Sequence, residues 1–252
     1  MNAPTIFLIL AALGLSAGSG WAAEIKEDPR IHVSLSLASP TSVEINWDDD
    51  VKDADGYVVE WTASLESDFV RLDYLAPTIR AYKHVDLMPE SPSYYRVRRI
   101  RGGASEAAKI SLPEDLLEAE YVERMAGSED YSWAVPQRLP QPLTLRATSL
   151  RKSKEEAVAA VPTHVRATLM PVTVSGFKVT WLDHASDEDG FLLELKTDQR
   201  DTFEVRAVLE PDTNSIGYAL EPPQRKGWVR VRAYALSAPS RIVSLVTGNE
   251  KK

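Results

Sequence analysis

One stretch of this 252-residue chain occurs twice, and the repeat restricts the fold more than any other feature. The first copy spans residues 43–61 and the second spans residues 177–195. In each copy a tryptophan precedes a glycine by nine positions, and an aromatic residue and then a glutamate follow that glycine. The correspondence continues at an offset of 134, because residues 96–98 and 230–232 both read Arg-Val-Arg. The sequence therefore predicts two copies of one structural module.

Apolar residues alternate along short runs in both copies, as they do in strands with one buried face. The inward-facing sets begin with Val43, Ile45 and Trp47 in the first copy, and with Phe177, Val179 and Trp181 in the second. Turn-forming residues separate the runs, and about seven short strands with frequent turns are typical of a β-sandwich. The predicted fold class is therefore all-β, with one sandwich in each copy.

The length suits two domains of about 100 residues each with a connection between them. We predict a first module at 31–112, a linker at 113–161 and a second module at 162–247. A helix is expected near 113–126, because Leu117, Tyr121 and Met125 recur at helical spacing. The start of the second module stays open, because residues 143–148 and residues 165–168 have similar sequences.

Several motifs then resemble a fibronectin type III domain. They include Trp47, the sequence Asp-Gly-Tyr-Val-Val-Glu at 55–60, and Tyr95–Arg98 after Leu87-x-Pro89. The second copy carries a similar Asp-Gly-Phe-Leu-Leu-Glu at 189–194. The resemblance implies two immunoglobulin-like β-sandwiches (fibronectin type III-like) joined by a partly helical linker, with each tryptophan in a core. It also implies that the third, sixth and seventh strands of one module share a sheet.

The same resemblance gives two further expectations for the first module. A hairpin around Arg101–Gly103 would return the chain into a seventh strand from Ser105 to Leu112. Arg99 stands where such domains usually place a small inward-facing residue. We therefore expect either that the strand twists outward there or that the Arg99 side chain extends to the edge of the sheet.

Residues 1–23 have the pattern of a secretory signal peptide. The apolar run Ile6–Leu15 is about half of what is needed to span a bilayer, and small residues follow it. Cleavage after Ala22 and cleavage after Ala23 both fit, although no lysine or arginine precedes the run; a buried N-terminal helix is the alternative. We expect an exported protein of bacterial type, secreted or in the periplasm or cell envelope, with no membrane span after signal cleavage.

The composition excludes several functions. A net charge of -8 disfavours nucleic acid as a partner, because phosphate binding needs a basic surface. The four histidines are scattered, and the chain has neither a phosphate-binding loop nor a Gly-x-Ser-x-Gly motif. We therefore expect no enzymatic activity. No cysteine is present, so no disulfide stabilises either module.

Two acidic loops are candidate calcium sites, because Ca²⁺ prefers clustered carboxylate oxygens. The candidate ligands are Asp48, Asp53 and Asp55 in the first copy, and Asp183, Asp187 and Asp189 in the second. The alternative is that these residues form solvated turns, for which Asp-Gly is well suited. No other cofactor is expected.

The outward face of the predicted sixth strand is a candidate ligand surface in both copies. Its side chains are Tyr94, Arg96 and Arg98 in the first copy, and Trp228, Arg230 and Arg232 in the second. Aromatic rings and guanidinium groups suit sugar or acidic-polymer ligands. The alternative is that these arginines form cross-strand ion pairs with Glu60 and Glu194 on the neighbouring strand.

The sequence thus predicts a non-catalytic exported binding or spacer protein, whose partner is a protein or a polysaccharide at the cell envelope or outside the cell. The alternative is a carbohydrate-binding accessory subunit of a polysaccharide-degrading system.

Overall fold

The computed structural model describes residues 26–113, 132–142, 158–170, 175–221 and 223–248. The signal peptide predicted at 1–23, and the helix predicted near 113–126 apart from Pro113, lie outside these residues. The described part of the chain is all-β, and its one helical element is the short 3-10 turn η1 (Ser132–Ala134). The partly helical linker therefore finds no support in the described residues. None of the helical structure described there could cross a membrane.

The first sandwich contains two sheets built from the N-terminal strands. One sheet has the order β1-β2-β5, and β3, β4 and β6 belong to the facing sheet. The strands are β1 (Ile31–Ser39), β2 (Ser42–Asp49), β3 (Gly56–Thr62), β4 (Val70–Leu75), β5 (Ala81–His84) and β6 (Pro92–Arg101). Trp47 is buried between the sheets with its ring 5.7 Å from that of Tyr57, as predicted.

The second sandwich repeats this arrangement. One sheet has the order β12-β9-β8, and β10, β11 and β13 belong to the facing sheet. The strands are β8 (Thr163–Leu169), β9 (Gly176–Leu182), β10 (Gly190–Thr197), β11 (Glu204–Leu209), β12 (Ser215–Ala219) and β13 (Lys226–Leu236). Trp181 packs on Phe191 at 5.6 Å, which confirms a second buried tryptophan in a separate core. The linker segment around Gln137 runs along this sandwich, where its amide donates to the Ser215 carbonyl at 2.8 Å.

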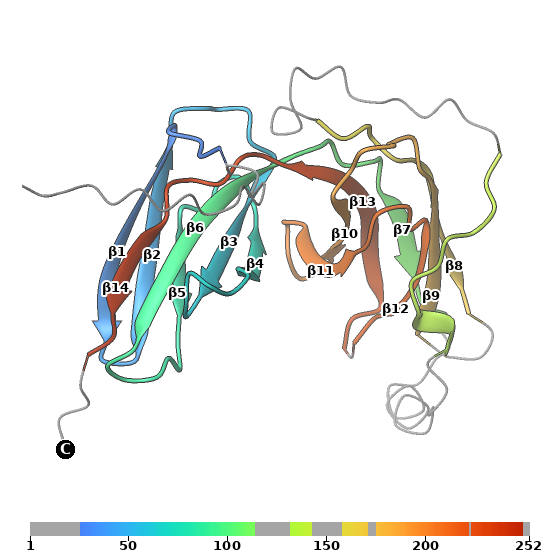
Figure 1. The fold of residues 1–252 in the computed structure, drawn as a ribbon. Coiled ribbons are helices and arrows are strands. Elements are labelled where there is room, and N and C mark those ends of the chain that lie inside the picture. Colours follow the sequence, from blue (N-terminus) through green and yellow to red (C-terminus); the bar gives the residue numbers. More distant parts are fainter. Residues whose placement is uncertain (1–25, 114–131, 143–157, 171–174, 222, 249–252) are drawn as a thin grey trace, which may run out of the picture.

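The last strands of the two sandwiches are exchanged. Strand β7 (Ala108–Ser111) pairs with β13 of the second sandwich, and β14 (Val243–Val246) pairs with β6 of the first. Figure 1 shows the C-terminal β14 beside β1 and β6, and β7 among the strands of the other half. The predicted hairpin at Arg101–Gly103 is therefore wrong. The contiguous ranges 31–112 and 162–247 each also end in a strand that belongs to the opposite sandwich.

The exchange joins the two larger sheets into one. Where the two chains cross, β13 pairs with β6 through Ala235 opposite Arg101 and Leu236 opposite Ile100. The resulting eight-stranded sheet has the order β11-β10-β13-β6-β3-β4, with β7 and β14 beside that path. Gly102 lies at this crossing, and a Cβ atom there would come within 1.9 Å of the Ala233 carbonyl oxygen. Only glycine permits so close an approach of two backbones.

The crossing is held by equivalent hydrogen bonds in both copies. The Asp55 side chain accepts a hydrogen bond from the Gly102 amide at 2.8 Å. At the offset of 134, Asp189 accepts one from the Leu236 amide at 2.7 Å. The aspartate of each Asp-Gly motif therefore fixes the chain at the point where it leaves its own sandwich.

Two serines continue this symmetry along the exchanged segments. The Ser105 hydroxyl accepts a hydrogen bond from the Val231 amide, and the Ser240 hydroxyl accepts one from the Val97 amide, both at 3.0 Å. Val97 and Val231 are equivalent positions in the repeat. Each departing segment is thus held on the opposite sandwich by the same backbone contact.

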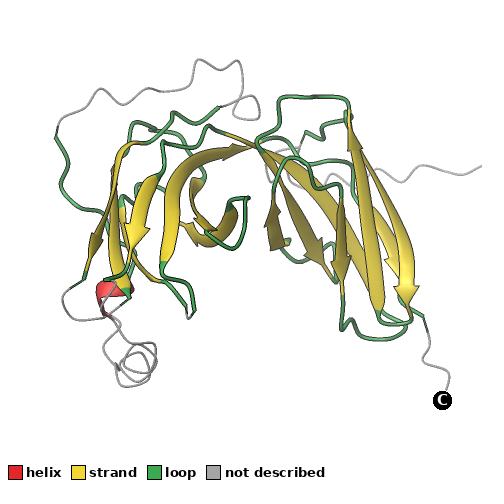
Figure 2. Ribbon diagram, turned by 180° about the vertical axis from the view of Figure 1, so that it is seen from behind, coloured by secondary structure: helices red, strands yellow, loops and turns green. Residues whose placement is uncertain are grey.

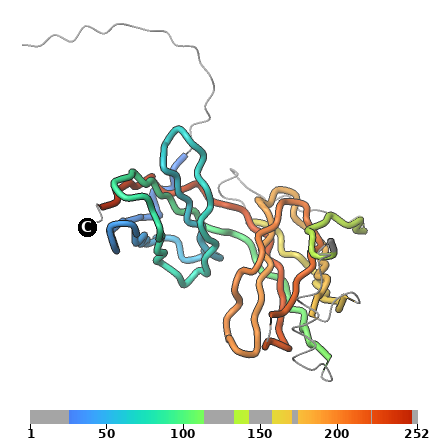
Figure 3. Tube along the Cα trace, turned by 90° about the horizontal axis from the view of Figure 1, so that it is seen from below, coloured from blue at the N-terminus to red at the C-terminus, as the bar shows by residue number. Residues whose placement is uncertain are grey.

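The two sandwiches lean apart from the crossing like the sides of an arch (Figures 1 and 2). Seen from below, the chain passes from one half to the other by two neighbouring segments (Figure 3). An apolar cluster fills the angle between the halves, and its buried members are Val58, Ile100, Leu192, Tyr234 and Leu236. These contacts and the continuous sheet hold the two sandwiches in one orientation.

Candidate functional site

A cleft lies under the arch and takes its lining from both sandwiches. Its volume is about 420 Å³. The first sandwich contributes Asp55, residues 73–79 and Ile100, and the second contributes Leu192, Glu194, residues 202–205, Arg230 and Arg232. Two of the six predicted ligand residues, Arg230 and Arg232, therefore belong to this cleft.

The second-sandwich wall of the cleft is an ion-paired and stacked arrangement. Arg230 Nε donates to Glu194 Oε2 at 2.5 Å, and the guanidinium lies 4.0 Å from the centre of the Phe203 ring. Arg232 Nε donates to the other Glu194 oxygen at 2.7 Å. Arg232 also donates to the Gly102 carbonyl at 2.7 Å, so it ties the second sandwich to the crossing segment.

The first sandwich contains the same arginine–phenylalanine stack, at residues that do not line the cleft. Arg96 Nε donates to Glu60 Oε2 at 2.5 Å, and its guanidinium lies 4.1 Å from the Phe69 ring centre. Arg96 is absent from the cleft lining, so the same motif is placed in two different environments. The cross-strand ion pairs considered from the sequence are present in both copies.

Arg98 differs from its repeat equivalent Arg232. Its Nε lies 3.7 Å from Glu60 Oε2, is buried, and makes no hydrogen bond within the described residues. Burial lowers the pKa of Arg98, and the nearby Glu60 carboxylate offsets only part of that effect. Arg98 is thus a weakly compensated cation on the same sheet face.

The remaining two predicted ligand residues are half-buried and lie outside the cleft lining. The Lys196 ammonium group lies 5.5 Å from the centre of the Trp228 ring. Tyr94 lies opposite Ser244 of the exchanged strand β14. The structure therefore does not gather the six predicted side chains into one surface. Phe69 and Phe203, which support the arginines, could be found only from their equivalent places in the repeat.

Arg99 forms a buried network with two aspartates, and neither outcome expected for it is correct. The side chain is fully buried, with Nη1 at 2.5 Å from Asp28 Oδ2 and Nε at 2.5 Å from Asp49 Oδ2. Burial opposes its charge, but the hydrogen bonds to Asp49 and Asp28 outweigh burial and raise the pKa of Arg99. Burial likewise disfavours the charged aspartates, yet the arginine bonds hold the pKa values of Asp28 and Asp49 below their usual range.

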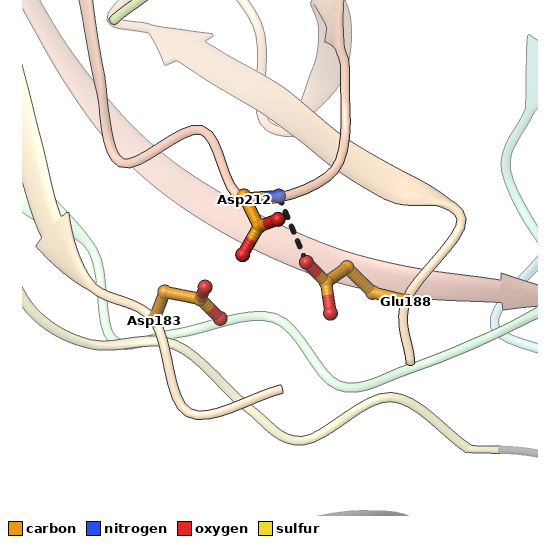
Figure 4. A group of neighbouring side chains, drawn as sticks. All are labelled: Asp183, Glu188 and Asp212. Carbon is orange, nitrogen blue, oxygen red and sulfur yellow. Dashed lines mark hydrogen bonds between the residues drawn. The ribbon is translucent and has the colours of Figure 1, made fainter. Parts of the chain in front are cut away.

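A group of three carboxylates lies at one end of the second sandwich. Asp183 and Glu188 lie in the loop between β9 and β10, and Asp212 lies in the loop between β11 and β12. One oxygen of each lies within 4.8 Å of the other two, and Figure 4 shows the three carboxyl groups pointing toward one another. The Asp212 amide donates to Glu188 Oε1 at 2.9 Å.

The predicted calcium ligands overlap this group only at Asp183. Asp55 and Asp189 bind backbone amides at the crossing, and Asp53 forms an exposed ion pair with Arg101 at 2.8 Å. Asp48 is exposed. Asp187 is half-buried in the same loop as Glu188 but is not part of the group. Within the ranges that the structure describes, no second group of three such residues has this spacing.

Comparisons with known protein families, curated proteins and solved structures gave the following similarities. Neither a protein-family model nor a curated protein matches the chain. Among solved structures, a segment of two fibronectin type III domains from chicken tenascin is 10% identical, with 86% of this chain and 98% of that chain covered and a TM-score of 0.26. The sixth fibronectin type III domain of human fibronectin type III domain containing protein 3 is 23% identical, covering 33% of this chain and 74% of that chain, also with a TM-score of 0.26. The structural neighbours thus include fibronectin type III domains, which are β-sandwiches.

Proposed function

We propose that the protein is a non-catalytic binding protein that holds its ligand in the cleft between the two sandwiches. The observation that carries this proposal is the strand exchange, because it fixes two sandwiches around a cleft lined by both. A hinge motion that opened the arch would break the pairing of β13 with β6 and expose the apolar cluster around Tyr234. The cleft is therefore preformed, which reduces the entropic cost of binding.

The lining indicates a ligand with both polar and apolar groups. Leu75 and Ile79 supply accessible apolar surface, whereas Arg230 and Glu194 supply a donor and an acceptor that are already oriented by each other. The Arg230 guanidinium is already held in place by its stacking on the Phe203 ring. Its remaining N–H donors can therefore bind a ligand with little further loss of side-chain entropy. A polysaccharide chain or an extended protein segment meets these requirements, and nucleic acid does not fit a chain of net charge -8.

The proposed place of action is the cell envelope or the outside of the cell, and the protein would be of an exported bacterial type. Support comes from the signal-like sequence at 1–23. Sequencing the N-terminus of the exported protein would test this proposed location. Residues 1–22 or 1–23 should be absent from that material, according to whether cleavage follows Ala22 or Ala23.

The binding proposal is tested with a pair of variants at equivalent positions. Arg230→Ala removes a cleft residue, whereas Arg96→Ala removes the same Glu-paired and Phe-stacked side chain outside the cleft lining. Binding is measured on a polysaccharide array, and by affinity electrophoresis in gels containing the polysaccharides that bind. We expect Arg230→Ala to weaken binding at least tenfold and Arg96→Ala to leave it close to wild type. Equal binding by both variants would remove the cleft from the proposal.

A third variant, Trp228→Ala, distinguishes binding in the cleft from the alternative function. In a carbohydrate-binding accessory subunit that uses the half-buried Trp228 ring, Trp228→Ala would abolish binding while Arg230→Ala retained it. Trp228 lies outside the cleft lining, and Lys196 lies over its ring. We therefore expect Trp228→Ala to bind as the wild type does.

A further inference from the structure

The two sandwiches place different groups around the same buried aspartate. Asp49 and Asp183 are equivalent in the repeat, and both are buried at the end of the strand that carries the core tryptophan. In the first sandwich the guanidinium of Arg99 binds Asp49 through two hydrogen bonds of 2.5 and 2.8 Å. The position equivalent to Arg99 in the second sandwich is Ala233. There, two further carboxylates approach the aspartate instead.

Glu188 is the member of this group that points most directly to a bound cation. It is only 8% exposed, and its Oε2 is buried with no hydrogen-bond partner within the described residues. Its Oε1 accepts only the Asp212 amide among the hydrogen bonds described, and its carboxyl group points toward the other two carboxylates (Figure 4). A buried carboxylate oxygen without a donor is costly unless a cation lies beside it. The equivalent position in the first sandwich is Ala54.

We propose that Asp183, Glu188 and Asp212 bind one calcium ion, in the part of the second sandwich where the first holds a guanidinium. Ca²⁺ binds carboxylate oxygens at about 2.3–2.6 Å, so oxygens around one ion are separated by up to about 5 Å. The three oxygens lie within 4.8 Å of one another, which fits this range. Backbone carbonyls and water complete the six to eight ligands that Ca²⁺ takes.

The ion would join two loops that are distant in sequence. The β9–β10 loop carries Asp183 and Glu188, and the β11–β12 loop carries Asp212. A shared cation therefore stabilises the end of the second sandwich that adjoins the crossing of the exchanged strands, since Asp189 in the same loop binds the Leu236 amide there. The site is separate from the cleft, since none of its three residues lines that cleft. Loss of calcium binding would leave the proposed cleft function untouched, and the reverse also holds.

The test compares full-length protein freed of metal by chelation with the same protein in added CaCl₂. Isothermal titration calorimetry measures Ca²⁺ affinity, and Tb³⁺ emission sensitised by Trp181, two residues from Asp183, reports occupancy directly. At a calcium concentration of about 100 times Kd, the Tm of wild type should rise by roughly 5 °C or more. Magnesium should produce a smaller rise, because it needs a stricter octahedral geometry.

Variants locate the site. Glu188→Gln keeps the side-chain shape but removes the charge, and should weaken Ca²⁺ binding at least tenfold and abolish the calcium-dependent rise in Tm. Asp212→Asn should do the same, and circular dichroism of both variants in chelator checks that they fold. Asp50→Asn, in the acidic loop of the first sandwich, is the matched control and should bind as wild type. The proposal is overturned if wild type shows no Ca²⁺-dependent change up to about 10 mM, roughly ten times the weakest Kd of extracellular calcium sites, or if Glu188→Gln binds equally well.

Discussion

A pair of engineered cysteines gives a direct test of the strand exchange. The chain contains no native cysteine, so any disulfide in a double variant is the designed one. Tyr94 and Ser244 are direct partners in the pairing of β6 with β14. Direct partners in antiparallel strands have Cα atoms about 4.5–5.5 Å apart, which is within the range that disulfides require. The variant Tyr94→Cys/Ser244→Cys should therefore form an intramolecular disulfide on mild oxidation.

The matched control distinguishes exchanged from unexchanged sandwiches. If β14 stayed with its own sandwich, the repeat would place Ser244 opposite Trp228. In the structure Trp228 instead faces Lys109 of the exchanged strand β7. The variant Trp228→Cys/Ser244→Cys should therefore remain reduced, or form disulfides only between molecules.

The disulfide also has a predictable effect on stability. It closes a loop of roughly 150 residues, which lowers the entropy of the unfolded chain enough to stabilise the fold by up to about 5 kcal/mol. Urea unfolding with and without reductant measures that difference, and electrophoresis without reductant identifies the linked species. The exchange is refuted if the control pair forms the disulfide within one chain while the Tyr94/Ser244 pair does not. A covalent dimer from the Tyr94/Ser244 pair would refute exchange within a single chain.

Three further results are expected from the described contacts. Arg99→Met leaves two buried carboxylates without their cation and should lower the free energy of unfolding by about 3–5 kcal/mol in urea titrations; a loss below about 1 kcal/mol would contradict the network. The pKa values of Asp28 and Asp49 are lower in the folded state, so the unfolded chain binds more protons below about pH 5. The stability that these two aspartates contribute should therefore be complete above that pH and should fall as the pH drops toward their folded-state pKa values. The fall should be shallower in Asp49→Asn. An equally steep fall in that variant would refute the role assigned to Asp49. Gly102→Ala places a methyl group against a backbone carbonyl and should cost more than about 2 kcal/mol, and a thermal melt equal to wild type would show that the chains do not cross so closely.

The sequence was sufficient to predict the two sandwich cores, because the alternation that ends in Trp47 and Trp181 reports directly on which faces are buried. It was not sufficient to assign the last strands. The sixth strands of both copies read Arg-Val-Arg, so each offers nearly the same backbone and side chains to either final strand. The choice depends on the path of the chain at Gly102, which local sequence patterns do not encode.

The carboxylate group shows a second limit of sequence patterns. Asp183 was predicted as a ligand because it lies in an acidic loop, but Asp212 stands alone in sequence and is brought beside it by the pairing of β12 with β9. Arg99 is a similar case, since its partners Asp28 and Asp49 lie 71 and 50 positions away. Contacts of this kind depend on tertiary structure, and periodicity within one segment does not report them.

The position of β14 sets the order in which the chain can mature during synthesis. The N-terminal sandwich lacks one strand until residues 243–246 have left the ribosome, although its other strands were made more than 140 residues earlier. Until then the edge of β6 is open to other chains, a state prone to misassembly. Removing residues 243–246 would therefore damage the half of the molecule that was translated first.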